Sequence, residues 1–177
     1  MSLLNAAFLY ISIKVELMKF FISAAILISI CFTPSDNLLT YCNARFDFCI
    51  KYPKNFKKQP DSENGDGGYF ISSDKKAEIS AFGMMLIGED EYDNAKYWFS
   101  ADTAGLKVSY KFQKPNWFVF SGTDTLGNIF YQKTIKKKVH YMGGDLEYVF
   151  LTLRIRYPIS QNALYSSYCD TIANSFK

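Results

Sequence analysis

Hydrophobic and polar residues alternate with a period of two in several stretches of the chain, a pattern typical of strands with one buried face. The first stretch is 46–52, and Pro53 ends it because proline cannot continue a central strand. Two more strands are predicted at 69–72 and 77–84, joined by a turn at 73–76. Four further strands are predicted nearer the C-terminus: 108–113, 117–121, 129–135 and 147–157.

Two stretches before and between these strands have no strand assigned to them. Residues 36–44 are a leading segment to which no strand is assigned. Residues 54–67 are mostly polar and contain the pairs Asn64-Gly65 and Asp66-Gly67. Both pairs tolerate positive φ, so the whole stretch is predicted to be a loop.

Two segments have helical spacing instead. Residues 89–104 open with Glu89-Asp90-Glu91, where the helix dipole favours negative charge, and Gly105 suits the helix end. The second segment begins at Ser160, a candidate N-cap. Its apolar residues recur every four positions and predict one buried stripe: Leu164, Tyr168, Ile172 and Phe176.

The order of these elements predicts an α+β fold: strands, a helix, four consecutive strands and a second helix. We expect a central antiparallel sheet of about six to seven strands flanked by helices, an α/β/α sandwich. Residues 36–177 would form it as a single domain. Aromatic residues make up 18% of the chain, and they favour strands.

The first 35 residues predict a targeting segment. Residues 18–32 consist of a Met and a Lys followed by a continuous apolar run, as in a secretory signal. The run is shorter than the ~20 residues of a transmembrane helix, so no membrane span is expected after cleavage. Residues 1–17 lack a basic start, and Met18 is the expected true initiator. The mature protein would be periplasmic or secreted.

Two alternatives remain for this segment. The first is one long anchoring helix over 1–32, which Lys14, Glu16 and Lys19 would interrupt. The second is lipid attachment at Cys31, which lies in a faint lipobox but follows Ile30 rather than a small residue.

Charge argues against a nucleic-acid partner. The chain has 20 basic and 17 acidic residues, and without residues 1–35 it has 18 and 16, a net charge of +2. The one basic cluster is Lys133 with Lys136-Lys137-Lys138, and we interpret it as a solvated strand end. The same balance argues against other strongly acidic partners.

Three cysteines remain in the domain: Cys42, Cys49 and Cys169. An exported protein can keep a disulfide, and three cysteines leave one unpaired. A bridge between Cys42 and Cys49 needs a turn between them, whereas a bridge to Cys169 would join the two ends of the domain. The sequence does not choose between these pairings, and no C-x-x-C spacing supports zinc or redox chemistry.

No residues form a recognisable catalytic set, and no metal or cofactor site is predicted. His140 is the only histidine, and we expect it in an exposed loop rather than as a base. Asp61, Glu63 and Asp66 do not match a calcium loop, because Gly65 occupies a ligand position. The remaining acids Glu89, Asp93 and Asp145 show no spacing that indicates a carboxylate pair.

A family resemblance comes from the two ends of the domain. The stretch Tyr41-x-Asn43-x-Arg45-Phe46-x-Phe48-x-Ile50-x-Tyr52-Pro53 resembles the opening strand of PsbP-like domains, and Tyr157-Pro158, a helix and Ser175-Phe176 resemble their close. The stretches 64–67 and 121–131 resemble uncharacterised exported bacterial proteins with the same fold. The resemblance implies a central antiparallel sheet flanked by helices and an accessory or binding role. No photosystem function or metal site is carried over from it.

Aromatic residues are the remaining functional hint. There are more of them than one core face requires, and four are candidates for a ligand groove: Trp98, Trp117, Tyr131 and Tyr141. The alternative is that they pack beneath the two helices.

These observations support three hypotheses. The first is a non-enzymatic envelope protein that binds or assists a partner, which would be an envelope protein, a glycan or a lipid. The second is a small hydrolase of envelope polymers that uses carboxylates such as Glu89, Asp93 or Asp145. The third is a structural lipoprotein anchored through Cys31.

Overall fold

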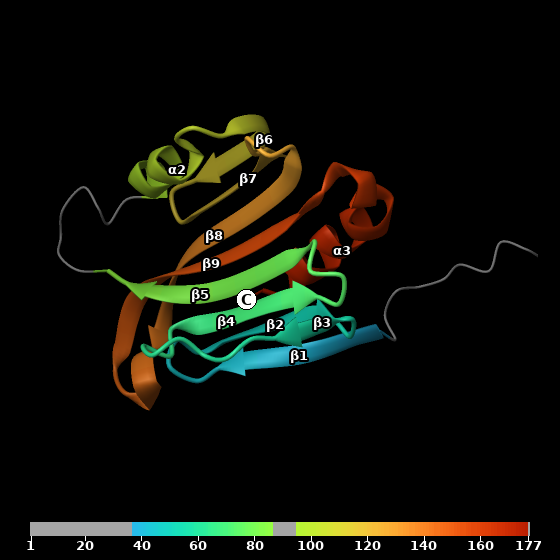
Figure 1. The fold of residues 1–177 in the computed structure, drawn as a ribbon. Coiled ribbons are helices and arrows are strands. Elements are labelled where there is room, and N and C mark those ends of the chain that lie inside the picture. Colours follow the sequence, from blue (N-terminus) through green and yellow to red (C-terminus); the bar gives the residue numbers. More distant parts are fainter. Residues whose placement is uncertain (1–36, 87–94, 177) are drawn as a thin grey trace, which may run out of the picture. The chain divides into compact units, whose positions relative to one another are not determined.

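The computed structural model describes residues 37–86 and 95–176 (Figure 1). Residues 35–177 make up one compact unit. The predicted signal segment and the acids Glu89 and Asp93 lie outside the described residues. Within these residues no helix is both long and apolar enough to cross a membrane.

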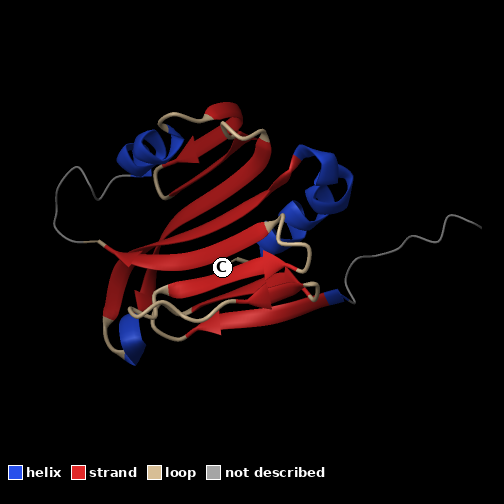
Figure 2. Ribbon diagram, in the orientation of Figure 1, coloured by secondary structure: helices blue, strands red, loops and turns tan. Residues whose placement is uncertain are grey.

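The described residues contain nine strands, which form two antiparallel sheets. Figure 2 shows the strands in red. The large sheet has seven strands in the order β3-β4-β5-β9-β8-β7-β6. Its strands are β3 Phe56–Lys58, β4 Gly67–Ser72, β5 Glu78–Met85, β6 Lys107–Lys114, β7 Trp117–Thr123, β8 Asn128–His140 and β9 Leu146–Pro158. The small sheet pairs β1 Leu38–Asn43 with β2 Phe48–Pro53. The predicted α+β fold with a central sheet is therefore confirmed.

One face of the large sheet carries the main core. In β9 the odd-numbered residues Val149, Leu151, Leu153 and Ile155 are buried there. The β1–β2 hairpin and helix α3 (Asn162–Ser175) pack against this side, which we call the α3 face. Phe48 of β2 meets Phe176 after α3, with ring centroids 5.6 Å apart.

The opposite face, which we call the α2 face, carries a smaller core. Helix α2 (Ala95–Thr103) packs here on Phe118, Phe120 and Phe150. Gly105 ends this helix region with a φ of +76°, a conformation that suits glycine. Helix α2 is the described part of the helix predicted at 89–104. Both faces of the sheet therefore carry a helix.

Two stretches to which the sequence assigned no strand, the leading segment 36–44 and the predicted loop 54–67, contain strands. Residues 36–44 include β1, which shows no alternation because only Asn43 in it is buried. The predicted loop 54–67 includes β3, whose Phe56 is only 3% exposed and packs on Tyr165 of α3. A three-residue strand with one buried residue is too short to show the alternation from which strands are predicted.

The C-terminal helix differs from its prediction in two details. It begins at Asn162 after a 3-10 turn, Ile159–Gln161, so Ser160 is not the N-cap. Leu164 is 50% exposed, and Tyr165 and Cys169 are buried in its place. A spacing of four exceeds the 3.6-residue turn, so a stripe read every four residues rotates by ~40° per step and leaves the buried face.

Candidate functional site

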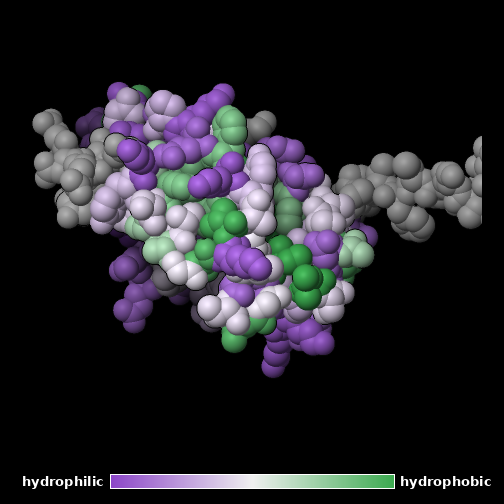
Figure 3. Space-filling model, turned by 90° about the horizontal axis from the view of Figure 1, so that it is seen from above, coloured by the Kyte–Doolittle hydropathy of each residue, from purple (hydrophilic) through white to green (hydrophobic). Residues whose placement is uncertain are grey.

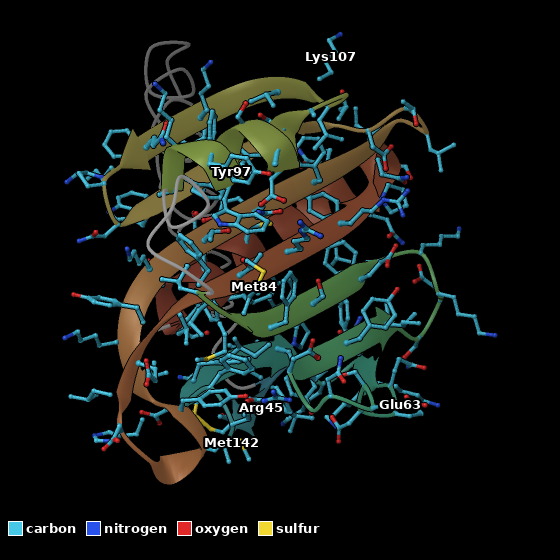
Figure 4. All side chains as sticks on the ribbon, turned by 90° about the vertical axis from the view of Figure 1, so that its left-hand side faces the viewer. Arg45, Glu63, Met84, Tyr97, Lys107 and Met142 are labelled. Carbon is cyan, nitrogen blue, oxygen red and sulfur yellow. A yellow bond between two sulfur atoms is a disulfide. The ribbon has the colours of Figure 1, made fainter. Side chains whose placement is uncertain are left out.

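The α2 face of the large sheet is only partly covered. In Figure 4 the helix carrying Tyr97 lies in front of the upper strands, whereas β5, with Met84, and β4 have no described helix in front of them. On β5 the residues on this face, Glu78, Ser80 and Phe82, are all partly exposed. Tyr69 of β4 is 39% exposed. The part of the α2 face that α2 does not cover is called the open face below.

A cavity of about 340 Å³ lies where α2 ends and the open face begins. Apolar residues such as Leu106, Phe120 and Phe130 line one part of it. The charged residues in its lining are two arginines of β9 and two aspartates: Arg154, Arg156, Asp102 and Asp124. The two arginines point to the same side because they are two residues apart on one strand.

Arg154 is held by residues from α2 and β8. Its Nη2 donates to Oδ1 of Asp102 at 3.0 Å, and its Nε donates to the side-chain oxygen of Gln132. The Gln132 amide in turn donates to Oδ2 of Asp102. This closed triangle fixes the guanidinium in one orientation, although 48% of the Arg154 side chain is exposed.

Arg156 is held by a second pair of carboxylates. Its Nε donates to Oδ2 of Asp124 at 2.7 Å, and its Nη1 donates to Oε1 of Glu78 at 2.9 Å. The Tyr69 hydroxyl donates to the other oxygen of Glu78. Burial, the hydrogen bond to Glu78 and the Glu78 charge raise the pKa of Tyr69 to about 12, so the phenol stays protonated.

Asp124 is fixed by the turn between β7 and β8. The backbone N–H groups of Leu126 and Asn128 both donate to Oδ1 of Asp124 at 2.9 Å. Burial acts to raise the pKa of Asp124, but the hydrogen bonds from Asn128, Arg156 and Leu126 outweigh it and lower the pKa to about 2. This carboxylate therefore stays ionised and is not a proton donor near neutral pH.

The hydrogen bonds that hold Arg154 and Arg156 leave some of their N–H groups unused. A guanidinium has five N–H groups, and the bonds above use two from each arginine. Asp102, Asp124 and Glu78 each accept bonds on both oxygens. The site therefore presents fixed hydrogen-bond donors rather than free carboxylates.

Two further hollows continue along the open face. One of about 310 Å³ is lined by Tyr69, Ser80 and Phe82. The other, of about 420 Å³, is lined by Tyr69, Glu78 and Lys57. Both hollows lie over β4 and β5, one beside the other along these strands. Ser80 pairs with Arg154 and Glu78 with Arg156 in the β5–β9 ladder, so each hollow lies next to one arginine of the 340 Å³ cavity. We call the cavity and these two hollows together the groove.

Charges in the groove balance. Its lining contains four acidic side chains, Asp66, Glu78, Asp102 and Asp124, and four basic ones, Lys57, Lys75, Arg154 and Arg156. The charged side chains of the groove thus sum to a formal charge of zero. On another side of the molecule, seen from above, hydrophilic residues make up much of the surface and hydrophobic residues gather near its middle (Figure 3).

The four aromatic residues predicted to form a ligand groove lie apart from one another. Trp98 packs under α2 on Phe150, with centroids 6.2 Å apart. Trp117 begins β7 and packs on a β6 ring, and Tyr141 accepts a hydrogen bond from Arg45 near the tip of the β8–β9 hairpin. Tyr131 packs against the main core and also contributes to the lining of the 340 Å³ cavity. The structure does not bring them together.

Residues considered for chemistry are also dispersed. His140 ends β8, is exposed, and has Nδ1 2.9 Å from the carbonyl oxygen of Gly144. Asp145 is exposed in the following turn. No group of three or more potential metal ligands occurs among the residues described.

The cysteine pairing left open by the sequence is Cys42 with Cys49. These residues face each other across the β1–β2 hairpin, with Cα atoms 4.1 Å apart, and form a disulfide. Cys169 is free and buried in α3. Burial raises the pKa of its thiol to about 11, so it is not a reactive thiolate.

Of the residues that line the groove, Tyr131 alone was predicted from the sequence as a groove residue. Arg154 and Arg156 occupy the polar positions of a regular alternation, which normally indicates a solvated face. Their partners are distant in sequence, with 52 positions between Asp102 and Arg154. Two arginines spaced by two on a strand were the available signal, and it is a weak one.

Comparison with known proteins identifies the fold. No family model matches the chain, and none of the curated proteins matches it in sequence. The structure is similar to the solution structure of cyanobacterial PsbP (CyanoP) from Synechocystis sp. PCC 6803, with a TM-score of 0.55 and 12% sequence identity. The match covers 80% of this chain and 92% of that one. The predicted PsbP-like fold is confirmed, and at this identity the likeness concerns the fold alone.

Proposed function

We propose that this PsbP-like chain is an exported, non-enzymatic accessory protein of the cell envelope that binds a ligand or partner through the open face. The observation that carries the proposal is a pair of arginines at a cavity of about 340 Å³. Hydrogen bonds from neighbouring side chains hold both of them, Arg154 and Arg156, in place. Rigid polar groups converging on a cavity are typical of binding sites. The loss of side-chain freedom has already occurred in the free protein, which favours binding.

The protonation state of Asp124 supports binding rather than hydrolysis. A general acid needs a pKa near the working pH, whereas hydrogen bonds lower the pKa of Asp124 to about 2. Asp124 therefore does not donate a proton to a leaving group near neutral pH. The carboxylates of Asp102 and Glu78 are engaged in ion pairs with Arg154 and Arg156.

The proposal of export has two supports. Residues 18–32 have the pattern of a secretory signal. The Cys42–Cys49 bridge is exposed on the β1–β2 hairpin, and such a disulfide persists in oxidising compartments but is reduced in the cytosol. The lipidated form would attach through Cys31, ahead of the domain.

Two measurements on the full chain in its native cell test the proposal. Fractionation with maleimide labelling is expected to find the protein in the envelope or medium, with Cys42 and Cys49 protected until reduction. A photo-cross-linking amino acid at Tyr69 is expected to give a saturable adduct, and the same group at Tyr110 is not. Tyr110 is the matched control because it is also exposed, at 56%, but lies on β6. A cytosolic, reduced protein, or equal labelling from both sites, would overturn the proposal.

A further inference from the structure

We infer that the groove binds a neutral, hydroxyl-rich chain, a linear oligosaccharide segment of an envelope glycan. The inference rests on the proposed function, because it names the ligand class of the same open face. Three features of the groove carry it: its charge balance, its fixed donors and its length across the strands.

Charge balance disfavours a charged ligand. The groove contains four acidic and four basic side chains, and three ion pairs join five of them: Arg154 with Asp102, and Arg156 with both Glu78 and Asp124. An anion would have to compete with these carboxylates for the guanidinium groups, and a cation would have to displace the arginines. A neutral ligand meets neither opposition.

The polar groups suit hydroxyl groups. The guanidinium N–H groups that are not used in the bonds described above can donate hydrogen bonds. The hydroxyl of Ser80, which lies opposite Arg154 in the β5–β9 pairing, can both donate and accept. Sugar hydroxyls likewise donate and accept, so they can satisfy both kinds of partner. The Arg154 guanidinium lies over the Phe82 ring, with its carbon 5.5 Å from the ring centroid, and this contact also helps to hold the guanidinium in place.

Apolar surface accompanies these groups, as a sugar ring requires. Tyr69 is 39% exposed between two of the hollows, and Phe82 is partly exposed beside it. The ring of Tyr69 is anchored by its hydroxyl, which donates to Glu78. Its face is therefore available to the C–H side of a sugar ring without further loss of freedom.

The groove is long enough for several sugar units. Its hollows extend from β8, through β9 and β5, to β4. Neighbouring strands lie ~4.8 Å apart, so the three intervals from β8 to β4 span ~14 Å. A single small molecule would fill one hollow, whereas a chain crossing the strands would contact the 340 Å³ cavity and one of the hollows over β4 and β5.

The test uses three hexasaccharides that differ in charge. Chitohexaose is neutral, the glucosamine hexamer is its cationic counterpart, and hexagalacturonate is anionic. Backbone and side-chain NH signals of the purified oxidised protein are followed by NMR at up to about 10 mM sugar, which detects dissociation constants near 1 mM. Cellohexaose and maltohexaose, also neutral, are measured in the same way.

We expect at least one neutral hexamer to shift signals of Gln132, Ser80 and Tyr69, and to bind about tenfold more tightly than either charged hexamer. Affinity should rise from the monosaccharide to the trisaccharide. Tyr69→Ala and Arg154→Lys should each weaken binding about tenfold, because they remove the ring and the planar fork. Tyr110→Ala should leave binding unchanged, and the thermal unfolding of each variant shows whether it is folded.

Other outcomes separate this inference from the proposed function. If the open face binds only a charged hexamer or a peptide, the glycan inference fails and the proposed function stands. If signals of the open face shift with protein concentration alone, the occupant is a second copy of the chain, and the glycan inference fails. If no neutral hexamer shifts them and the Tyr69 photo-cross-linker also gives no adduct, both fail.

Discussion

Removal of the Cys42–Cys49 disulfide should destabilise the domain by an amount that chain entropy sets. The double substitution Cys42→Ser with Cys49→Ser leaves the β1–β2 hairpin and its packing in place, because both side chains are exposed. The contacts of the hairpin do not involve the cysteines: the rings of Tyr41 and Phe70 of β4 have centroids 5.4 Å apart, and Phe48 packs on Phe176. The main effect is therefore on the unfolded chain, which gains conformational freedom.

The magnitude follows from the size of the closed loop. The bridged residues are 7 positions apart, and the loop-closure relation then gives about 2.4 kcal/mol. For a domain of this size, a change of 1 kcal/mol lowers the melting temperature by about 3 °C, so the expected shift is about 7 °C. A loss of this size is a large fraction of a typical domain stability.

Urea denaturation followed by circular dichroism measures the change. Wild-type protein with and without a reducing agent provides the internal control, because reduction should give the same loss as the double serine variant and should not affect that variant. A loss below about 1 kcal/mol, or a difference between reduction and substitution, would refute the entropic explanation. It would show that the disulfide and the native hairpin contacts are not independent.

Three further predictions concern the groove, a packed glycine and the free thiol. The folded pKa of Asp124 is about 2 against an ordinary 3.8, so its stabilisation is complete above pH 3.8 and is lost as the pH falls through 2. Between pH 6 and pH 2 the free energy of unfolding should therefore fall by about 1 kcal/mol less in Asp124→Asn than in the wild type. Unfolding experiments across this pH range measure the difference, and an equal fall in both proteins would contradict the prediction. In Gly83→Ala the new Cβ would lie 2.2 Å from Cγ of Phe46, and the free energy of unfolding should fall by about 3 kcal/mol. In Gly65→Ala the φ of +60° is unfavourable but the Cβ meets open space, so the free energy of unfolding should fall by only about 1 kcal/mol. Cys169 should react with a thiol reagent only after unfolding, because it is buried and its pKa is about 11; rapid labelling of the native protein would show that α3 opens.

Periodicity determined most of the large sheet from the sequence alone. β8 buries alternate residues over most of its length, and β9 does so from Leu153 to Tyr157, so a local pattern was enough to assign these two strands. β7 buries three consecutive residues, 118–120, and its apolar run after a turn was the available signal. Length and element order then limited the architecture to a central sheet with helices. The resemblance at Tyr52-Pro53 and Tyr157-Pro158 added the PsbP-like fold, which the structural comparison confirms.

Only the tertiary structure decided the pairing of the cysteines and the existence of the groove. The β1–β2 register placed Cys42 opposite Cys49, and that register is set by the turn and by packing on Phe70 and Phe176 rather than by local sequence. Arg154 meets Asp102 because α2 folds back over β8 and β9. Polar side chains of an alternating strand look identical in sequence whether water or a carboxylate faces them, and the packing of distant elements makes that difference.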